Sequence, residues 1–295
     1  DDRAPARGSV QIFRIKIARR ILPYAAMLTT FVLSWALMQR AEVTGYLVIG
    51  TVVAAFAWTI RYSLTRMDKI ERERLWCALI IWAMWACYAA LIEQTGSSLN
   101  LFAARLVDLH LAGFELQASQ MQGATTSFLL LVSPFFAWLW VYLDRRGLNP
   151  PTPPKLAIAI FALAAGFGGI ALGTLFPDSA GKVSIAWLIL TYFCFAVAAL
   201  ILQPIGLSTV TRLTADRIVG FMVGLWMLAV AIGSWAAAQI ARLSSLDSSL
   251  KASSPAALLA HYQNFFAVVG LSALALALMF LALTPLMRRW MHGMR

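Results

Sequence analysis

Charged side chains are scarce in this sequence. Only 13% of its 295 residues are Asp, Glu, Lys or Arg, whereas 61% are hydrophobic, and the mean hydropathy is +0.75. A soluble domain carries roughly 25% charged residues and under about half apolar ones. The shortage of charge excludes a soluble fold and predicts a protein embedded in a lipid bilayer.

Cysteine and metal-ligand patterns are also nearly absent. The three cysteines, Cys77, Cys87 and Cys194, fall inside apolar stretches, and none forms a CxxC pair. No His or Cys residues lie at the spacing of metal ligands. We therefore expect no disulfide framework, no metal site and no cofactor, and we interpret the cysteines as small packing residues.

The net charge of +11 comes from basic residues in the short segments between apolar stretches. Basic loops beside membrane spans are typical of cytoplasmic exposure, so this charge does not indicate a nucleic-acid partner. With the amino terminus in the cytoplasm and each stretch crossing once, 19 of the 24 Lys and Arg residues fall on the cytoplasmic side. This asymmetry predicts that both termini are cytoplasmic.

The apolar residues form blocks of about 20 residues, the length that crosses about 30 Å of hydrocarbon. We predict an all-α integral membrane protein with eight transmembrane helices. Only three residues separate the first two blocks, so these should form a tight antiparallel hairpin. The eight blocks are Ile21–Gln39, Val43–Ile60, Leu75–Ile92, Met121–Leu143, Leu156–Phe176, Val183–Leu207, Ile218–Ala241 and Phe265–Met287.

Two of these blocks carry glycines four residues apart, Gly169 with Gly173 and Gly220 with Gly224. This spacing lets the backbones of neighbouring helices approach closely within a bilayer. We interpret both pairs as packing contacts.

The third block runs into a polar cluster and then becomes apolar again. The cluster contains Glu93, Gln94, Gly96, Ser97 and Ser98. The glycine allows the backbone to bend, and the hydroxyls can hydrogen-bond to the carbonyls that a bend frees. A charge near the bilayer centre costs about 2.5–3.5 kcal/mol, so Glu93 should face a cavity or a partner. The cluster is a candidate lining for a wet site; alternatively, the helix ends here and Glu93 meets the outer headgroups.

Three motifs resemble those of a known transporter family. They are EQTGSSLNLFA at Glu93–Ala103, PIGLSTVTRL at Pro204–Leu213 and GFMVGLW at Gly220–Trp226. The proton-dependent oligopeptide transporters carry FEQxGSSLxLFADR, SPIGLSxxTKLAP and GFMMGxWF in the same order and at the same spacing. The sequence resembles this family over essentially its whole length.

The resemblance implies a major-facilitator fold of two six-helix halves, between which many bacterial members insert a helix pair. Residues 1–20 would form a basic cytoplasmic linker, 21–62 the inserted hairpin, 63–74 a charged cytoplasmic linker and 75–295 the carboxyl-terminal half. The amino-terminal half, with its ExxERFxYY motif, is not found, and the chain begins with Asp1, so we expect a region of a longer protein. The bilayer of a bacterial inner membrane and the missing half are its expected partners.

The resemblance also implies a symporter for short peptides, with protons as the coupling ion. Glu93 would pair with an arginine of the first half and help to release the substrate, with Gln94 and Ser97 beside it. Trp226 would line the pocket, and Thr125 stands where the family has the asparagine of QxLNP. We expect Glu93, Thr125 and Trp226 to be exposed on the face that meets the missing half.

Two departures from the family pattern concern the pocket. The family's glutamate that binds the peptide amino terminus lies five residues before the proline of SPIGLS, where this sequence has Ala199. No carboxylate occurs anywhere in the block Val183–Leu207. In addition, Ala89 replaces the tryptophan of FWxxFEQ, although Trp85 lies one turn away.

These departures leave other functions open. One alternative is a symporter for a non-peptide solute, and another is a non-transporting membrane scaffold or receptor with the same fold. A membrane enzyme would need paired carboxylates or a serine–histidine set inside the spans. The three histidines lie at or beyond the ends of the apolar blocks, so we do not expect an enzyme.

Overall fold

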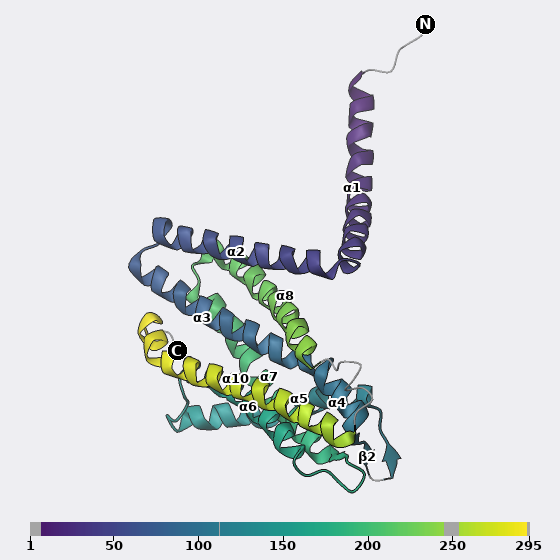
Figure 1. The fold of residues 1–295 in the computed structure, drawn as a ribbon. Helices are drawn as coiled ribbons and strands as arrows, with labels where there is room; N and C mark the ends of the chain where they lie inside the picture. Colours follow the sequence, from purple (N-terminus) through teal and green to yellow (C-terminus); the bar gives the residue numbers. More distant parts are fainter. Residues whose placement is uncertain (1–6, 112, 245–253, 294–295) are drawn as a thin grey trace. The chain divides into compact units, whose positions relative to one another are not determined.

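The computed structural model describes residues 7–111, 113–244 and 254–293, which are mostly helical (Figure 1). The chain divides into two compact units, Asp1–Val53 and Ala54–Arg295.

The first unit contains helix α1 (Arg7–Met38) and the first part of α2 (Ala41–Arg66). The Thr44 hydroxyl donates a 2.7 Å hydrogen bond to the carbonyl of Leu37 across the short turn between them. The connection is therefore as short as predicted, while antiparallel packing of the two helices stays a prediction. The predicted basic linker, residues 1–20, lies partly outside the described residues and is helical from Arg7 onward.

The second unit contains the remaining helical elements and the short strands. Its helical elements after α2 are α3 (Lys69–Ile92), η1 (Glu93–Thr95), α4 (Ser98–Leu106), α5 (Ala118–Arg145), α6 (Thr152–Gly173), α7 (Ile185–Leu213), η2 (Asp216–Ile218), α8 (Val219–Leu243) and α10 (Pro255–Trp290). Its strands are β1 (Val107–Asp108), which pairs in parallel with β4 (Val183–Ser184), and β2 (His110–Leu111), which pairs antiparallel with β3 (Phe114–Glu115). These two-residue strands are additions to the predicted helical fold.

Seven described helical segments are long and apolar enough to cross a membrane. They are Ala41–Arg66, Lys69–Leu106, Ala118–Arg145, Thr152–Gly173, Ile185–Leu213, Asp216–Leu243 and Ala256–Trp290. Within α1, the apolar stretch Leu22–Met38 is shorter and spans only about 26 Å, against a hydrocarbon core of about 30 Å. The all-α membrane fold is confirmed, and the count of eight spans stays a prediction.

The predicted charged linker 63–74 is helical apart from Met67 and Asp68. Asp68 caps α3, because its carboxylate accepts a 2.7 Å hydrogen bond from the backbone N–H of Glu71. Carboxylates at a helix amino terminus also interact favourably with the helix dipole, so a charged sequence can start a helix ahead of its apolar part.

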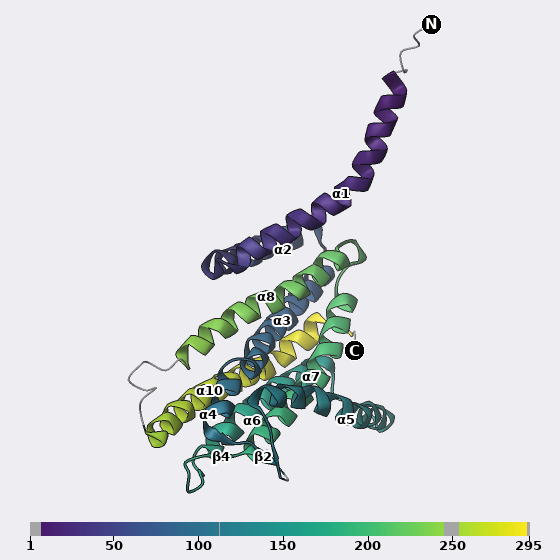
Figure 2. The ribbon, with the colours of Figure 1, turned by 90° about the vertical axis from the view of Figure 1, so that its right-hand side faces the viewer.

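Helix α6 packs against α7 with one face and against α10 with the opposite face (Figures 1 and 2). The contact with α7 depends on glycine: a Cβ at Gly173 would lie 2.5 Å from the ring of Trp187, and one at Gly169 would lie 3.6 Å from Leu190. The first predicted glycine pair is therefore a packing contact. The second pair is not one among the described residues, because a Cβ at Gly220 or Gly224 would meet no atom within 4 Å.

Helices α3 and α8 form a second close pair. A Cβ at Gly233 would lie 2.5 Å from the Cβ of Ala89 and 2.9 Å from the carbonyl oxygen of Ala86. Ala89, which replaces a family tryptophan, is 3% exposed in this contact. The small side chain at position 89 therefore fits the close approach of α8, which leaves no room for an indole.

Candidate substrate and coupling site

The polar cluster that follows α3 is a break in a long helix. After Ile92 the chain forms the 3₁₀ turn η1, and the α-helix resumes at Ser98 as α4. Hydroxyls satisfy carbonyls at the break: Thr95 donates to the Ile92 carbonyl at 2.8 Å, and Ser97 donates to the Glu93 carbonyl at 3.2 Å. The α-helix is therefore interrupted at the cluster and continues after it, while the depth of Glu93 in the bilayer and the role of the cluster as a wet lining stay predictions.

Gln94 attaches this break to α8. Its side chain is fully buried, and its amide nitrogen donates to the carbonyls of Ala237 at 3.1 Å and Ala90 at 3.3 Å. Its amide oxygen accepts from the hydroxyls of Ser98 at 2.8 Å and Ser97 at 3.3 Å. Both donors and both acceptor positions of the amide are used, so Gln94 holds the break in place rather than presenting a free polar group.

The network continues from Ser98 to the ends of two further helices. The hydroxyls of Ser98 and Ser244 lie 2.8 Å apart, and the Ser244 hydroxyl can donate its one proton either to Ser98 or to the Ala241 carbonyl at the end of α8. The Nε2 atom of His261, near the start of α10, lies 3.4 Å from the Ser244 carbonyl oxygen. A fully connected polar network of this kind fixes the relative positions of its helices.

Glu93 itself is exposed on the other side of the break. It lies at a cavity of about 260 Å³ that Ser97 and Ser234 also line. No hydrogen bond or ion pair within the described residues involves the Glu93 carboxylate. The other carboxylates of the long helices, Glu42, Glu71, Glu73 and Asp144, all lie within two turns of a helix end. Glu93 differs from them in its place: it follows the last residue of α3, begins η1 and so lies at the break before α4.

Three aromatic rings stack between α3 and α8. The ring centroids of Trp226 and Trp85 are 4.8 Å apart with an interplanar angle of 6°, and those of Trp85 and Tyr88 are 5.0 Å apart at 11°. Gly206 of α7 completes the enclosure, because a Cβ there would lie 2.6 Å from the Trp226 ring. We expected Trp226 to be exposed, and this was wrong: it is 3% exposed, since Trp85 and α7 cover it.

Ala199 is buried in α7, where it offers no polar group. The next polar side chain on the same helix face is Gln203, four residues later. Its amide nitrogen donates a long hydrogen bond, 3.5 Å, to the hydroxyl of Tyr88. The neutral side chains of Gln203 and Tyr88 therefore lie near position 199, where the family resemblance implies a carboxylate.

Thr125 lies on α5, apart from the other candidate residues. Its side-chain oxygen is buried and has no hydrogen-bond partner among the described residues. No hydrogen bond of the described chain joins it to Glu93 or Trp226. An unpaired buried hydroxyl costs roughly 1–3 kcal/mol, so it is a candidate donor to a group that binds here.

The structure adds four residues that the sequence interpretation did not select: Trp85, Tyr88, Gln203 and Ser234. Gln203 and Ser234 had a usable signal, because each is an isolated polar residue within an apolar block. The stacking of Trp85 and Tyr88 depends on how α3 and α8 face each other, which the sequence pattern does not give.

A broken membrane helix with polar groups at the break, packed in a bundle of long apolar helices, is typical of secondary transporters. The chain is accordingly a multi-pass membrane protein of the transporter class and not an enzyme. It belongs to the POT family, whose sequence profile matches residues 5–255.

Named relatives agree with this membership. The peptide transporter YePEPT of Yersinia enterocolitica is 30% identical over 202 residues, which cover 68% of this chain and 39% of the relative. Dipeptide and tripeptide permease B of Photorhabdus luminescens is 26% identical over 268 residues, which cover 90% of this chain and 54% of the relative. The chain thus spans about half the length of the curated relatives it matches.

Solved structures give the same picture. A peptide transporter POT in complex with sulfate matches with a TM-score of 0.72 and 25% identity, covering 95% of this chain and 55% of the other. Tetrameric PepTSo2 matches with a TM-score of 0.74 and 25% identity, covering 92% and 55%. The helical fold described above is therefore that of about half of a POT transporter.

Proposed function

We propose that this chain is the carboxyl-terminal part of a proton-coupled transporter for di- and tripeptides or related small solutes. The substrate binds between this part and an amino-terminal half that the chain does not include. Relatives named as dipeptide and tripeptide permeases support the substrate class. The observation that carries the proposal is Glu93, a carboxylate at a helix break with no hydrogen-bond or ion-pair partner among the described residues.

An isolated carboxylate in a membrane protein has two ways to avoid the cost of an unpaired charge. It can take up a proton, or it can pair with a cationic group across a cavity. Switching between the two states links protonation to the arrangement of the two halves, which rock about a site between them. In this scheme Glu93 is either protonated or, after losing its proton, paired with an arginine of the opposing half.

The residues around Glu93 have separate tasks in this proposal. Gln94 positions the break against α8, so the Glu93 backbone keeps a fixed orientation. Ser97 and Ser234 provide hydroxyls in the cavity, where they can hydrogen-bond to the substrate or to water. Thr125 contributes a hydroxyl from α5, and Trp226 becomes available to a substrate when its stack with Trp85 opens.

The test is Glu93→Gln in the full-length protein, reconstituted into proteoliposomes. Glutamine keeps the shape and hydrogen-bonding capacity of glutamate and removes the charge that an arginine needs. Substrate exchange across the membrane should remain, whereas uptake driven by a proton gradient should fall at least about tenfold, the factor expected when about 1.4 kcal/mol of interaction is lost.

The matched control is Glu115→Gln, which removes an exposed carboxylate in the β2–β3 hairpin and should leave both activities unchanged. Normal concentrative uptake by Glu93→Gln would show that Glu93 has no coupling role.

Ala199 favours one variation of this proposal. A protonated amino terminus that enters a partly dry pocket loses its water shell, at a cost of several kcal/mol unless an anion compensates. With an alanine at this position, the pocket suits solutes that lack a free ammonium group, or peptides whose amino terminus binds elsewhere. Competition of a labelled dipeptide by its amino-acetylated analogue distinguishes the two.

A further inference from the structure

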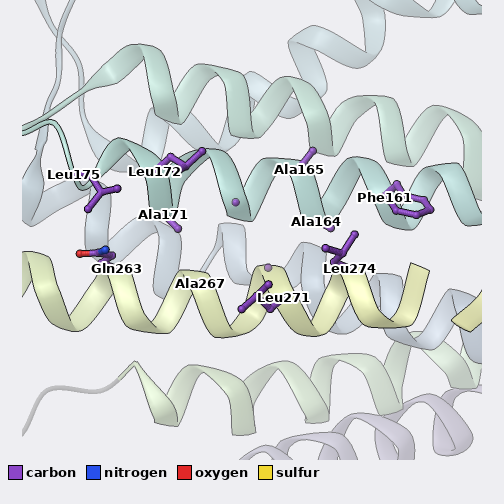
Figure 3. A pocket seen from close by; sticks show the side chains of 12 residues that line it. Phe161, Ala164, Ala165, Ala171, Leu172, Leu175, Gln263, Ala267, Leu271 and Leu274 are labelled. Carbon is purple, nitrogen blue, oxygen red and sulfur yellow. The ribbon is translucent and has the colours of Figure 1, made fainter. Parts of the chain in front are cut away.

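A groove of about 460 Å³ runs along the surface between α6 and α10, apart from the candidate site (Figure 3). Twelve residues line it, and eleven of them are Ala, Gly, Leu or Phe. Leu172 projects from α6, Leu175 from the turn that follows it, and Leu271 and Leu274 from α10. The groove is therefore apolar along almost its whole length.

Small residues produce the groove. On α6 its floor includes Ala164 and Gly168, and on α10 it includes Ala267 and Gly270. The helices nearly touch there, since a Cβ at Gly270 would lie 3.2 Å from the backbone nitrogen of Gly168. A Cβ at Gly168, by contrast, would meet no atom within 4 Å, because it would point into the open groove.

The walls of the groove are exposed apolar side chains on two membrane-crossing helices and in the turn that follows α6. Leu172 and Leu175 are 54% and 52% exposed, and Leu271 is 65% exposed. Large apolar side chains exposed on such helices indicate a surface that faces hydrocarbon rather than water.

The dimensions of the groove select the kind of occupant. From Phe161 to Gly173, the last residue of α6, the helix rises about 18 Å, which is longer than one leaflet of a core about 30 Å thick. The length and the apolar lining of the groove suit one extended acyl chain.

The one polar lining residue lies at one end. Gln263 stands beside Leu175 and Ala171, and Phe161 lies at the other end of the groove (Figure 3). Its side chain is half-buried, and no hydrogen bond within the described residues uses its amide. An amide at the edge of hydrocarbon is stabilised when it donates to an oxygen, and ester carbonyls are the oxygens at that depth in a bilayer.

We propose that this groove is a phospholipid site, in which one acyl chain lies between α6 and α10 and an ester oxygen accepts a hydrogen bond from Gln263. The lipid comes from the leaflet at the α6 carboxyl end, where Gln263 lies. Many weak contacts with the groove walls, together with this hydrogen bond, favour the bound chain over a chain in the free bilayer.

The experiment uses the full-length protein in vesicles doped with a phospholipid that carries a photoreactive group at the end of its acyl chain. Cross-linked residues are mapped by mass spectrometry. Cross-links should be enriched about fivefold or more at Leu271 and Leu274 over Leu278 and Met279, which lie on α10 outside the groove and report lipid in free exchange.

Two pairs of variants separate groove binding from general lipid contact. Ala267→Leu fills the groove and should abolish the enrichment, whereas Ala275→Leu adds the same volume at an exposed position of α10 outside it. Gln263→Leu removes the donor and should reduce the enrichment, whereas Asn264→Leu changes the neighbouring exposed amide and should not.

Equal cross-linking at groove and reference positions would overturn the proposal, as would enrichment that survives Ala267→Leu. A cysteine at Leu271 that forms a disulfide with the same position of a second copy would also overturn it, because the groove would then be a protein interface. Each readout is independent of transport activity and therefore of the proposed function.

Discussion

Glu93 and Ala199 determine which charges this part of the protein offers to a substrate. Glu93 is acidic and has no partner in the described part of the chain, whereas Ala199 is 2% exposed and apolar. Gln203, one turn from Ala199, is neutral and already hydrogen-bonded to Tyr88. A cationic amino terminus therefore has no anionic partner on α7, and we expect ordinary peptides to bind weakly through that group.

A carboxylate introduced at position 199 should give the peptide amino terminus an anionic partner. In the full-length protein, Ala199→Glu should strengthen binding of dialanine and leave an amino-acetylated analogue unaffected. A charge-assisted hydrogen bond contributes roughly 1.5–3 kcal/mol, so the gain should be about tenfold or more. Isothermal titration calorimetry of the purified transporter measures both ligands.

Ala199 is buried, so a glutamate at this position has to displace neighbouring side chains and can disturb folding. A second variant avoids this problem. Gln203→Glu places a carboxylate on the same face of α7 at an exposed position and should show the same preference in weaker form. Tight binding of dialanine by the unmodified protein, with no gain in either variant, would mean that another carboxylate takes this role.

At the scale of elements, the α3–α8 pair connects the two parts of the candidate site. Gln94 and the stack of Trp85 on Trp226 lie along the same pair of helices. Gly233 permits their close approach. A displacement of α8 relative to α3 would therefore change the indole stack and the support of the helix break together.

Gly233→Ala should destabilise the protein by about 1–3 kcal/mol, because the added methyl group meets backbone atoms of α3 that cannot rotate away. Gly224→Ala on the same helix is the matched control. Its methyl group meets open space in the described structure, so it should be neutral or stabilise by up to about 1 kcal/mol. Thermal unfolding in detergent measures both, and equal midpoints for the two variants would contradict this packing.

The sequence predicted the long helices well because each needs about 20 apolar residues, a property of local composition. It missed the true start of α3 at Lys69, since charged residues beyond the hydrocarbon region form a helix without an apolar signal. It also missed the cover over Trp226, because Trp85 is distant in sequence and α3 and α8 are apolar on most faces. With so little amphipathic contrast, the pattern does not tell which face of each helix meets the other.

At the scale of the whole molecule, the uneven distribution of basic residues predicts the orientation of the second unit. The loop between α5 and α6 supports it: the Arg146 guanidinium lies 4.5 Å from the centroid of the Tyr142 ring, and the Lys155 ammonium lies 4.4 Å from that of Trp140. Aromatic and basic residues together are typical of the headgroup region, and an excess of basic ones is typical of the cytoplasmic face.

Labelling by a membrane-impermeant maleimide tests this orientation in a cysteine-free background. Arg146→Cys should react only after the membrane is permeabilised, because its loop is expected in the cytoplasm. Ser179→Cys, in the exposed loop at the opposite end of α6, should react in intact cells. The reverse pattern would invert the predicted topology.

The stacked indoles give the molecule an intrinsic optical signal. Two nearly parallel indole rings with centroids 4.8 Å apart share their electronic excitation, so the pair absorbs circularly polarised light differently from two separate tryptophans. This coupling weakens steeply as the rings separate. The near-ultraviolet circular dichroism of the native protein therefore reports whether Trp226 is covered or open, without any attached dye.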